Sequence, residues 1–154
     1  MLLLSPGAGA LPEDSSAPVE IEADSANLDQ ARQVTIYTGD VEIRQGSMLL
    51  RADKVTINYK NGKPSVLTAI GNPASIKQKP GQDKAWITGK GQRIVYHLNS
   101  DEVILTGHAQ LLQNQDSFRS DRIVYSRRSG QLKAGSSAQG KQRVKVIIKS
   151  ESLQ

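Results

Sequence analysis

The 154-residue sequence contains no cysteine, which excludes disulfide bonds, thiol nucleophiles and thiolate metal ligands. Aromatic residues are scarce, with one Trp, one Phe and four Tyr, so a core must be built mainly from Val, Ile, Leu and Ala. The single tryptophan, Trp86, fits a core position and an exposed contact equally well. No apolar run approaches the roughly 20 residues that a membrane-spanning helix requires. We therefore expect a soluble chain of a size typical for one domain.

Groups that could carry out catalysis are also scarce. The two histidines, His97 and His108, have no His, Asp or Glu partner at a metal-ligand spacing. The sequence contains no nucleophile elbow, phosphate-binding loop or dinucleotide fingerprint. Asp53 and Asp121 lack a histidine, a second acid or a nucleophile at matching positions, and we interpret them as residues that cap corners of the chain. The sequence predicts no catalytic residue, no metal and no cofactor.

The chain is basic, with a formal net charge of +5, which favours anionic partners such as phosphate groups, nucleic acid or acidic membrane surfaces. A solvated basic surface without such a partner is an equally good interpretation. Arg127, Arg128, Lys141 and Arg143 could contact nucleic-acid phosphates. Single-strand binders also stack bases on exposed aromatic rings, whereas most of the tyrosines here alternate toward the predicted interior. A basic β-sandwich module for nucleic acid or another anion is therefore the alternative hypothesis.

The start of the chain resembles the end of a secretory signal. An apolar run, Leu2 to Leu4, precedes Ala8-Gly9-Ala10, which is typical of a signal-peptide cleavage site. We interpret residues 1–10 as a signal-peptide remnant, residues 11–17 as a flexible lead-in and residues 18–154 as the folded domain. The mature protein is then expected outside the cytoplasm.

Alternation of apolar and polar residues is the main structural signal. It is clear in residues 54–59, 94–98 and 143–149, and it places one face of each predicted strand on a core and the other in water. Clusters of turn-forming residues lie between the strands, at residues 60–64, 99–101 and 128–130. No window of eleven or more residues has convincing helical spacing. The sequence predicts an all-β fold of many short strands.

Two segments recur at a common offset of 68 residues. Thr38-Gly39 returns as Thr106-Gly107, and Arg51–Val55 returns as Arg119–Ile123. The same offset, without gaps, aligns Ile36 with Ile104, Ile43 with Leu111, Leu50 with Phe118 and Gly62 with Gly130. We predict an internal repeat of strand–turn–strand units, with glycines where strands bend sharply.

A stack of hairpins ends in two edge strands, and exposed edges recruit strands from other chains. The alternating runs Val19–Ala23 and Arg143–Lys149 are the candidate edges. Because these runs differ in sequence, pairing them is heterologous and gives an open, head-to-tail assembly of this chain with itself.

Five short segments carry a resemblance to a known family. They are Pro18–Asp24, Thr38–Val41, Ala52–Val55, Gly71–Ala74 and Leu105–Gly107. In this order and spacing they resemble the OstA-like, or LptA, family of periplasmic lipopolysaccharide transport proteins, over residues 18–154. The resemblance implies an open antiparallel β-jelly roll of about sixteen short strands in two facing sheets, with an apolar groove between them.

The resemblance also implies ligands and partners. Acyl chains of lipid A, the membrane anchor of lipopolysaccharide, are expected in the groove. Protomers joined head to tail are expected to link an inner-membrane anchored partner to the N-terminal domain of an outer-membrane translocon. The family's lipid-contacting positions fall on Ile76, Tyr96 and Leu98; alternation alone adds Ile36, Ile57, Ile94, Phe118 and Tyr125. The contact with the inner-membrane partner falls on Val19 and Ile21, and the outgoing contact falls on Val144, Val146 and Ile148.

Overall fold

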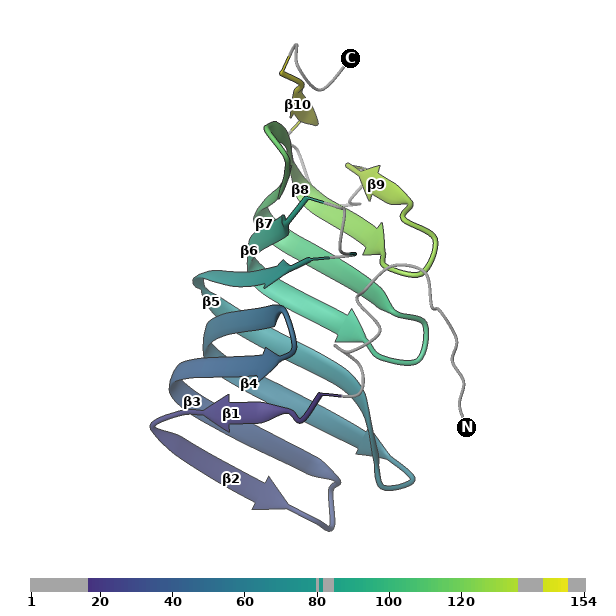
Figure 1. Ribbon diagram of the computed structural model, residues 1–154. Helices are drawn as coiled ribbons and strands as arrows, with labels where there is room; N and C mark the ends of the chain where they lie inside the picture. Colours follow the sequence, from purple (N-terminus) through teal and green to yellow (C-terminus); the bar gives the residue numbers. More distant parts are fainter. Residues whose placement is uncertain (1–16, 80, 82–84, 136–142, 150–154) are drawn as a thin grey trace, which may run out of the picture.

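The computed structural model describes residues 17–79, 81, 85–135 and 143–149, which form the all-β fold that the sequence predicts (Figure 1). The predicted signal remnant, and all of the predicted lead-in except residue 17, lie outside the described residues. Among the residues described, no helix has the length and apolar character needed to cross a membrane. The strands assigned in this part of the chain are β1 (Glu20–Glu22), β2 (Ser25–Asp29), β3 (Val34–Gln45), β4 (Met48–Lys60), β5 (Lys63–Gln78), β6 (Ile87–His97), β7 (Glu102–Gln113), β8 (Asp116–Ser126), β9 (Leu132–Ala134) and β10 (Lys145–Ile147).

All of these strands belong to one antiparallel sheet with the order β1-β3-β4-β5-β6-β7-β8-β10. Each end of the sheet carries two short strands. At one end, β1 pairs with residues 42–44 of β3 and β2 pairs with residues 34–38. At the other end, β10 pairs with residues 117–119 of β8 and β9 pairs with residues 123–125. Both runs predicted to lie at edges, in β1 and β10, therefore do so.

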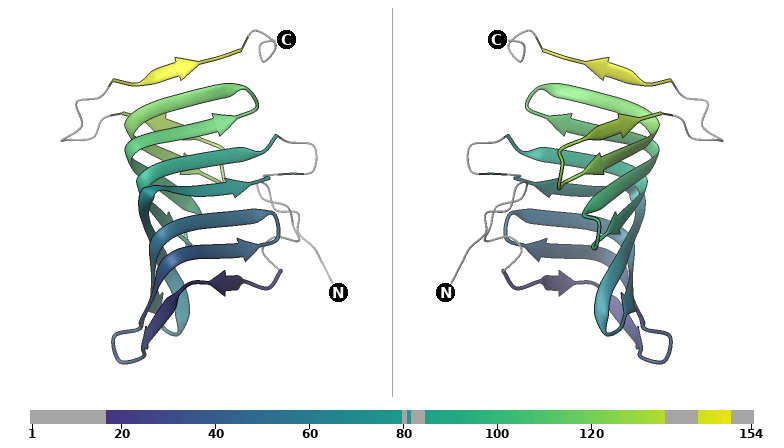
Figure 2. Two further views of the ribbon diagram at one scale, coloured as in Figure 1. Left: turned by 90° about the vertical axis from the view of Figure 1, so that its left-hand side faces the viewer. Right: turned by 90° about the vertical axis from the view of Figure 1, so that its right-hand side faces the viewer.

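The sheet bends across the middle of its long strands, so that its two halves face one another as layers (Figures 1 and 2). The strand register shifts along this bend, for example at residues 38–41 of β3 and 106–109 of β7. Such bulges increase the local twist and bend a strand. Layer A comprises residues 25–29, 34–38, 54–60, 63–70, 93–97, 102–106, 122–126 and 132–134; layer B comprises residues 20–22, 41–45, 48–52, 74–78, 87–91, 109–113, 116–120 and 145–147.

The described residues thus form ten strands in one sheet, where about sixteen short strands in two sheets were expected. The difference arises because β3 to β8 continue through the bend, and each of them contributes a stretch to both layers. Glycines do lie at the bend, since Gly39 and Gly107 have φ angles of +88° and +78°. The side chains of Asp24 and Gln92 lie against these two glycines.

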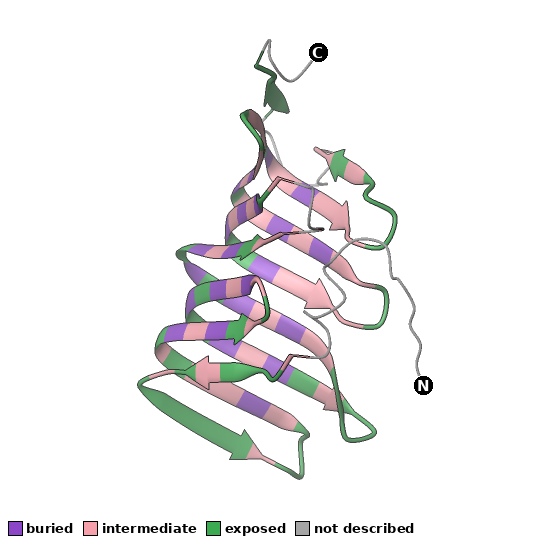
Figure 3. Ribbon diagram, in the orientation of Figure 1, coloured by how far each residue is buried: buried purple, intermediate pink, exposed green. Residues whose placement is uncertain are grey.

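Apolar side chains from both layers point into the space between them and form the core. Figure 3 shows buried residues alternating with more exposed ones along the central strands, whereas β2 is largely exposed. In β4 the alternation slips by one residue at the bend, where Asp53 and Lys54 are both exposed, so that Leu50 and Val55 are both inside. Fully burying a side chain of this kind contributes about 1.5–3 kcal/mol. The fully buried large apolar residues include Ile43, Leu50, Ile94, Leu105 and Ile123.

Unusual backbone conformations recur at the offset of the predicted repeat. Positive φ angles are uncommon for residues other than glycine, yet five residues with positive φ each have a positive-φ counterpart 68 positions later. The pairs are Gln33 with Asp101, Gly39 with Gly107, Asp40 with His108, Gly46 with Asn114, and Gly62 with Gly130. Turns and bends of the same kind therefore occupy equivalent places in the two halves of the chain.

Gly107→Ala should destabilise the protein more than Gly62→Ala. Both glycines have a φ of +78°, so a left-handed alanine costs about 1–2 kcal/mol at each position. A Cβ at Gly107 would also lie 2.8 Å from the Cβ of Gln92, whereas nothing lies within 4 Å of a Cβ at Gly62. Urea unfolding followed by circular dichroism should give a loss of unfolding free energy that is larger by about 1 kcal/mol or more for Gly107→Ala. Equal losses would show that the bend does not constrain this glycine.

Candidate functional site: the interior between the layers

A row of mainly apolar residues crosses layer A from one edge of the sheet to the other. Directly opposed residues of an antiparallel pair point to the same side, and Ile57 opposes Leu67, which opposes Tyr96. The polar exception is Thr35, which is buried and whose hydroxyl has no hydrogen-bond partner in the described part of the chain. The complete row is Leu28, Thr35, Ile57, Leu67, Tyr96, Val103, Tyr125 and Leu132.

A second row crosses layer B in the same way. It is Ile21, Ile43, Leu50, Ile76, Gly89, Leu111, Phe118 and Val146. Gly89 is the gap in this row, and a Cβ there would lie 3.1 Å from a methyl carbon of Leu105, which belongs to layer A. The missing side chain thus lets the two layers approach each other. Together the two rows line the interior between the edge strands of the sheet.

Most of the predicted lipid-binding residues line this interior. Ile57, Ile76 and Ile94 belong to the buried core, and Tyr96, Leu98, Phe118 and Tyr125 pack against it.

Ile36 is the exception, and its predicted inward position is wrong. It opposes Thr56, which lies between the core residues Val55 and Ile57 and therefore points outward. On the inward side of β3, Thr35 opposes Ile57. Alternation within β3 does not reveal this orientation, because both faces of the strand carry apolar groups.

Several interior residues were not predicted, among them Leu50, Leu67, Leu105 and Leu111. The repeat contained a signal for one of them, because its offset pairs Leu50 with Phe118. Leu67 and Leu105 each alternate with another buried residue, Ala69 and Val103, which would have indicated their inward side.

A polar cluster surrounds the hydroxyl of Tyr96, which lies near the middle of the interior row in layer A. The Tyr96 hydroxyl donates a hydrogen bond to the Asp101 carboxylate at 2.7 Å and accepts one from the guanidinium group of Arg127. The same guanidinium nitrogen of Arg127 lies 3.2 Å from Asp101, and the Arg127 side chain is only 13% exposed. The guanidinium carbon lies 5.3 Å from the centroid of the Tyr96 ring. The hydroxyl of this interior tyrosine is therefore hydrogen-bonded by a paired, largely buried arginine.

The interior tyrosines are held in their protonated form. Burial raises the pKa of Tyr96 well above its ordinary value of 10.0, and hydrogen bonding to Asp101 adds to this rise while the charge of Arg127 opposes it. Burial also raises the pKa of Tyr125, and it raises the pKa of Tyr37 with a smaller contribution from Tyr59. These hydroxyls are neutral hydrogen-bonding groups at physiological pH.

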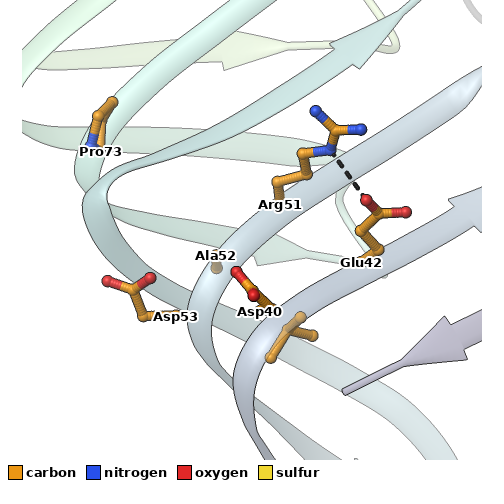
Figure 4. Close-up of a pocket in the computed structure, with 7 residues that line it drawn as sticks. Asp40, Glu42, Arg51, Ala52, Asp53 and Pro73 are labelled. Carbon is orange, nitrogen blue, oxygen red and sulfur yellow. Dashed lines mark ion pairs between the residues drawn. The ribbon is translucent and has the colours of Figure 1, made fainter. Parts of the chain in front are cut away.

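The pocket in Figure 4 lies on the outer side of the bend and offers paired charges. Glu42 lies 3.2 Å from the guanidinium group of Arg51 and 3.0 Å from that of Arg44. Asp40 and Asp53 also line the pocket. Among the described residues, no group of three or more His, Cys, Asp or Glu side chains is placed to hold a metal ion.

The predicted partner-binding residues lie at the two edges. Ile21 packs partly against the core, whereas Val19, Val144, Val146 and Ile148 are exposed.

Trp86 lies just before β6 and is 43% exposed, with the Lys77 ammonium 4.9 Å from its ring centroid. It is an exposed contact residue rather than part of the core.

Comparison with known proteins identifies the fold. A family model described as "LptA/(LptD N-terminal domain) LPS transport protein" matches residues 20–131, from β1 to beyond the end of β8. The chain belongs to this family. The resemblance inferred from the sequence segments is therefore confirmed. As a member of the LptA family, the chain is a lipopolysaccharide transport protein and not an enzyme.

Individual LptA-family members cover most of the chain. The lipopolysaccharide export system protein LptH of Pseudomonas aeruginosa is 38% identical over 127 residues, which are 82% of this chain and 73% of LptH. LptA of Haemophilus influenzae is 33% identical over 157 residues, covering 100% of this chain and 90% of that protein. The crystal structure of LptH matches with a TM-score of 0.82 and 33% identity, over 90% of this chain and 99% of that one. LptH is described as the LptA-homologous periplasmic component of the lipopolysaccharide transport device, in agreement with the periplasmic location expected here.

The free energy of unfolding of this LptA-family protein should fall as the pH rises above 10, the ordinary pKa of tyrosine. Because the folded-state pKa of Tyr96 is raised, the folded protein keeps a proton that the unfolded chain has released. The stability linked to this proton is present below pH 10 and is lost as the pH rises toward the raised pKa. Urea unfolding at a series of alkaline pH values should show a shallower decline for Tyr96→Phe than for the wild type. Identical pH slopes for the two proteins would contradict this.

Proposed function

We propose that this protein transports lipopolysaccharide by holding the acyl chains of lipid A between its two layers. The observation that carries this proposal is the pair of interior rows, each of which extends across the whole sheet from edge to edge. The interior is therefore lined by mainly apolar residues along the direction in which a lipid would have to move.

The hydrophobic effect supplies the binding energy. Each acyl methylene gains about 0.8 kcal/mol when it leaves water, so a lipid with several chains needs cover while it crosses an aqueous compartment. The backbone pairing of the described strands runs within each layer, so the layers can separate to admit chains without breaking a strand ladder. The residues proposed to contact acyl chains are Ile57, Ile76, Ile94, Tyr96, Leu98, Phe118 and Tyr125.

We also propose head-to-tail assembly through the edge strands. In a layer-by-layer joint, β10 of one protomer would pair with β1 of the next, and β9 would pair with β2. The rows of the two protomers would then continue across the joint, with Val146 near Ile21 and Leu132 near Leu28. Leu28 and Val146 are 66% and 44% exposed, and the joint would cover both.

The same edges are the proposed contacts with the membrane-bound partners. Val19 and Ile21 would meet the inner-membrane anchored partner, and Val144, Val146 and Ile148 would meet the N-terminal domain of the outer-membrane translocon. The family description names the LptD N-terminal domain beside LptA, which supports a partner of the same fold.

An internal repeat is the proposed origin of this architecture. The paired left-handed residues at an offset of 68 support it, because equivalent bends and turns would follow from duplication of one unit. Nucleic-acid binding is less well supported, because Tyr96 and Tyr125 pack against the core rather than forming a stacking surface.

Ile57→Asp should weaken lipopolysaccharide binding, whereas Thr56→Asp should not. The two positions are adjacent, but Ile57 points into the interior and Thr56 points outward. An ionised carboxylate among acyl chains is strongly unfavourable, so we expect a loss of affinity of roughly tenfold or more for Ile57→Asp alone. Binding of fluorescent lipopolysaccharide to both variants, with circular dichroism as the test of folding, measures the difference.

Equal affinities of the two folded variants would contradict the interior as the binding site. If Ile57→Asp does not fold, a photocrosslinking residue at Tyr96 should capture lipopolysaccharide, and one at the outward-facing neighbour Val95 should not.

Removal of β10 should abolish self-assembly. Unpaired edge strands expose backbone donors and acceptors, and the two unlike edges form an open rather than a closed assembly. Lys145 and Lys149 at the edge disfavour uncontrolled pairing, so we expect reversible association. Light scattering over a concentration series should detect species larger than a dimer for the full chain and a monomer for a chain that ends at Gly140. A full chain that stays monomeric, or a truncated chain that still polymerises, would rule out this joint.

A further inference from the structure

Four turns form one rim of layer A, at residues 30–33, 61–62, 98–101 and 127–131, and we call them the loop rim. Hydrogen bonds connect these turns to neighbouring turns or strand ends. The amide of Tyr59 donates to the carbonyl of Gln33 at 2.9 Å, the amide of Leu98 donates to the carbonyl of Ser65 at 3.0 Å, and the guanidinium of Arg128 donates to the carbonyl of Asn99 at 3.0 Å. The backbone of these turns is therefore held in place before any ligand arrives, which lowers the entropic cost of ordering it on binding.

A cavity of about 360 Å³ opens on the loop rim between the β4–β5 and β6–β7 turns. Its lining contains two cations, Lys60 and Lys63, and no acidic residue. The lining residues are Lys60, Asn61, Lys63, Pro64, Ser65 and Asn99.

Lys60 and Lys63 oppose each other directly across the hairpin. Like charges in this position are destabilising, and among the described residues neither lysine forms an ion pair. Two acids at the loop rim, Asp29 and Asp101, are paired with Arg32 and Arg127. Within the described part of the chain, no ion pair compensates the two lysine charges, and an anion in the cavity would do so.

The cavity lies at the loop rim, at the end of the strands that line the apolar interior, and Lys60 shares the outward-facing alternation of Lys54 and Thr56 in β4. Lys60 follows the interior residue Ile57 by three positions in β4, and a strand rises about 3.3 Å per residue, so the two are about 10 Å apart along the strand. An amphiphile with its chains beside Ile57 would place its polar head at this rim.

We propose that the Lys60–Lys63 cavity binds a phosphate group on the head of the lipid whose acyl chains occupy the interior. This inference rests on the proposed function. A phosphate monoester carries about −1.5 to −2 charges near neutral pH, enough to neutralise both ammonium groups. The Asn61 and Asn99 amides and the Ser65 hydroxyl of the lining are further hydrogen-bond donors.

The test compares Lys60→Gln/Lys63→Gln with the control Lys54→Gln/Arg93→Gln in the full-length chain. The control removes the same charge from two exposed positions on the outer face. Each protein is titrated with bisphosphorylated lipid A and with the same lipid after removal of both phosphates. We expect Lys60→Gln/Lys63→Gln to bind the phosphorylated lipid roughly fivefold more weakly, because it loses two exposed ion-pair contacts with the phosphate. Its affinity for the dephosphorylated lipid should not change. The control variant should bind both lipids like the wild type.

Three results would overturn the proposal, and they differ in what else they reject. Unchanged affinity of Lys60→Gln/Lys63→Gln for the phosphorylated lipid would reject the cavity and leave the interior as the lipid site. Saturable binding of inorganic phosphate alone, lost in that variant, would assign the cavity to free phosphate. A wild-type protein that binds neither lipid would reject the proposed function itself.

Discussion

The bend across the sheet is the constraint on which the rest of the structure depends. A sheet with one apolar face must bury that face against another element, and here the sheet covers itself. In β3, left-handed residues at Gly39-Asp40 turn the strand and leave Tyr37 and Val41 on the same inner side. In β4, the adjacent residues Asp53 and Lys54 are both exposed. This shifts the alternation by one residue and keeps Leu50 and Val55 on the inner side of the sheet. In residues 17–79, 85–135 and 143–149, one apolar interior therefore forms between two layers without a helix, and the sequence contains no cysteine for a disulfide.

This way of covering the core has consequences at the margins of the sheet. As far as the described residues show, the bent sheet keeps unpaired edges at both ends, where β1, β2, β9 and β10 lie. It also keeps a rim of turns on which charged groups gather, including Arg127 in its pair with Asp101 and, with no ion pair among the described residues, Lys60 and Lys63. An apolar interior beside a charged rim matches the polarity of a phosphorylated lipid, and open ends allow the interior to continue into a neighbour. Binding and passing on such a lipid requires no catalytic group.

The sequence predicted much of this arrangement, because alternation and turn residues act locally. From the sequence we predicted that Ile57 and Tyr96 point inward, that the runs in β1 and β10 lie at the edges of the sheet, and that glycines lie where strands bend. The orientation of Ile36 did not, because β3 carries apolar groups on both faces and only its pairing with β4 decides between them. The number of strands also differed, because residues at the bend resemble residues that end a strand. The contact of Arg127 with Tyr96 joins positions 31 apart and depends on how neighbouring turns meet.

Methyl NMR of the complex with lipid A tests most directly whether acyl chains lie between the layers. Isoleucine methyl groups are available as probes on both faces of layer A. Ile57 and Ile94 point into the interior, whereas Ile36 and Ile104 point outward. Nuclear Overhauser effects from acyl-chain protons should reach the methyl groups of Ile57 and Ile94 and not those of Ile36 and Ile104. Contacts confined to Ile36 and Ile104 would place the lipid on the outer face and contradict the account.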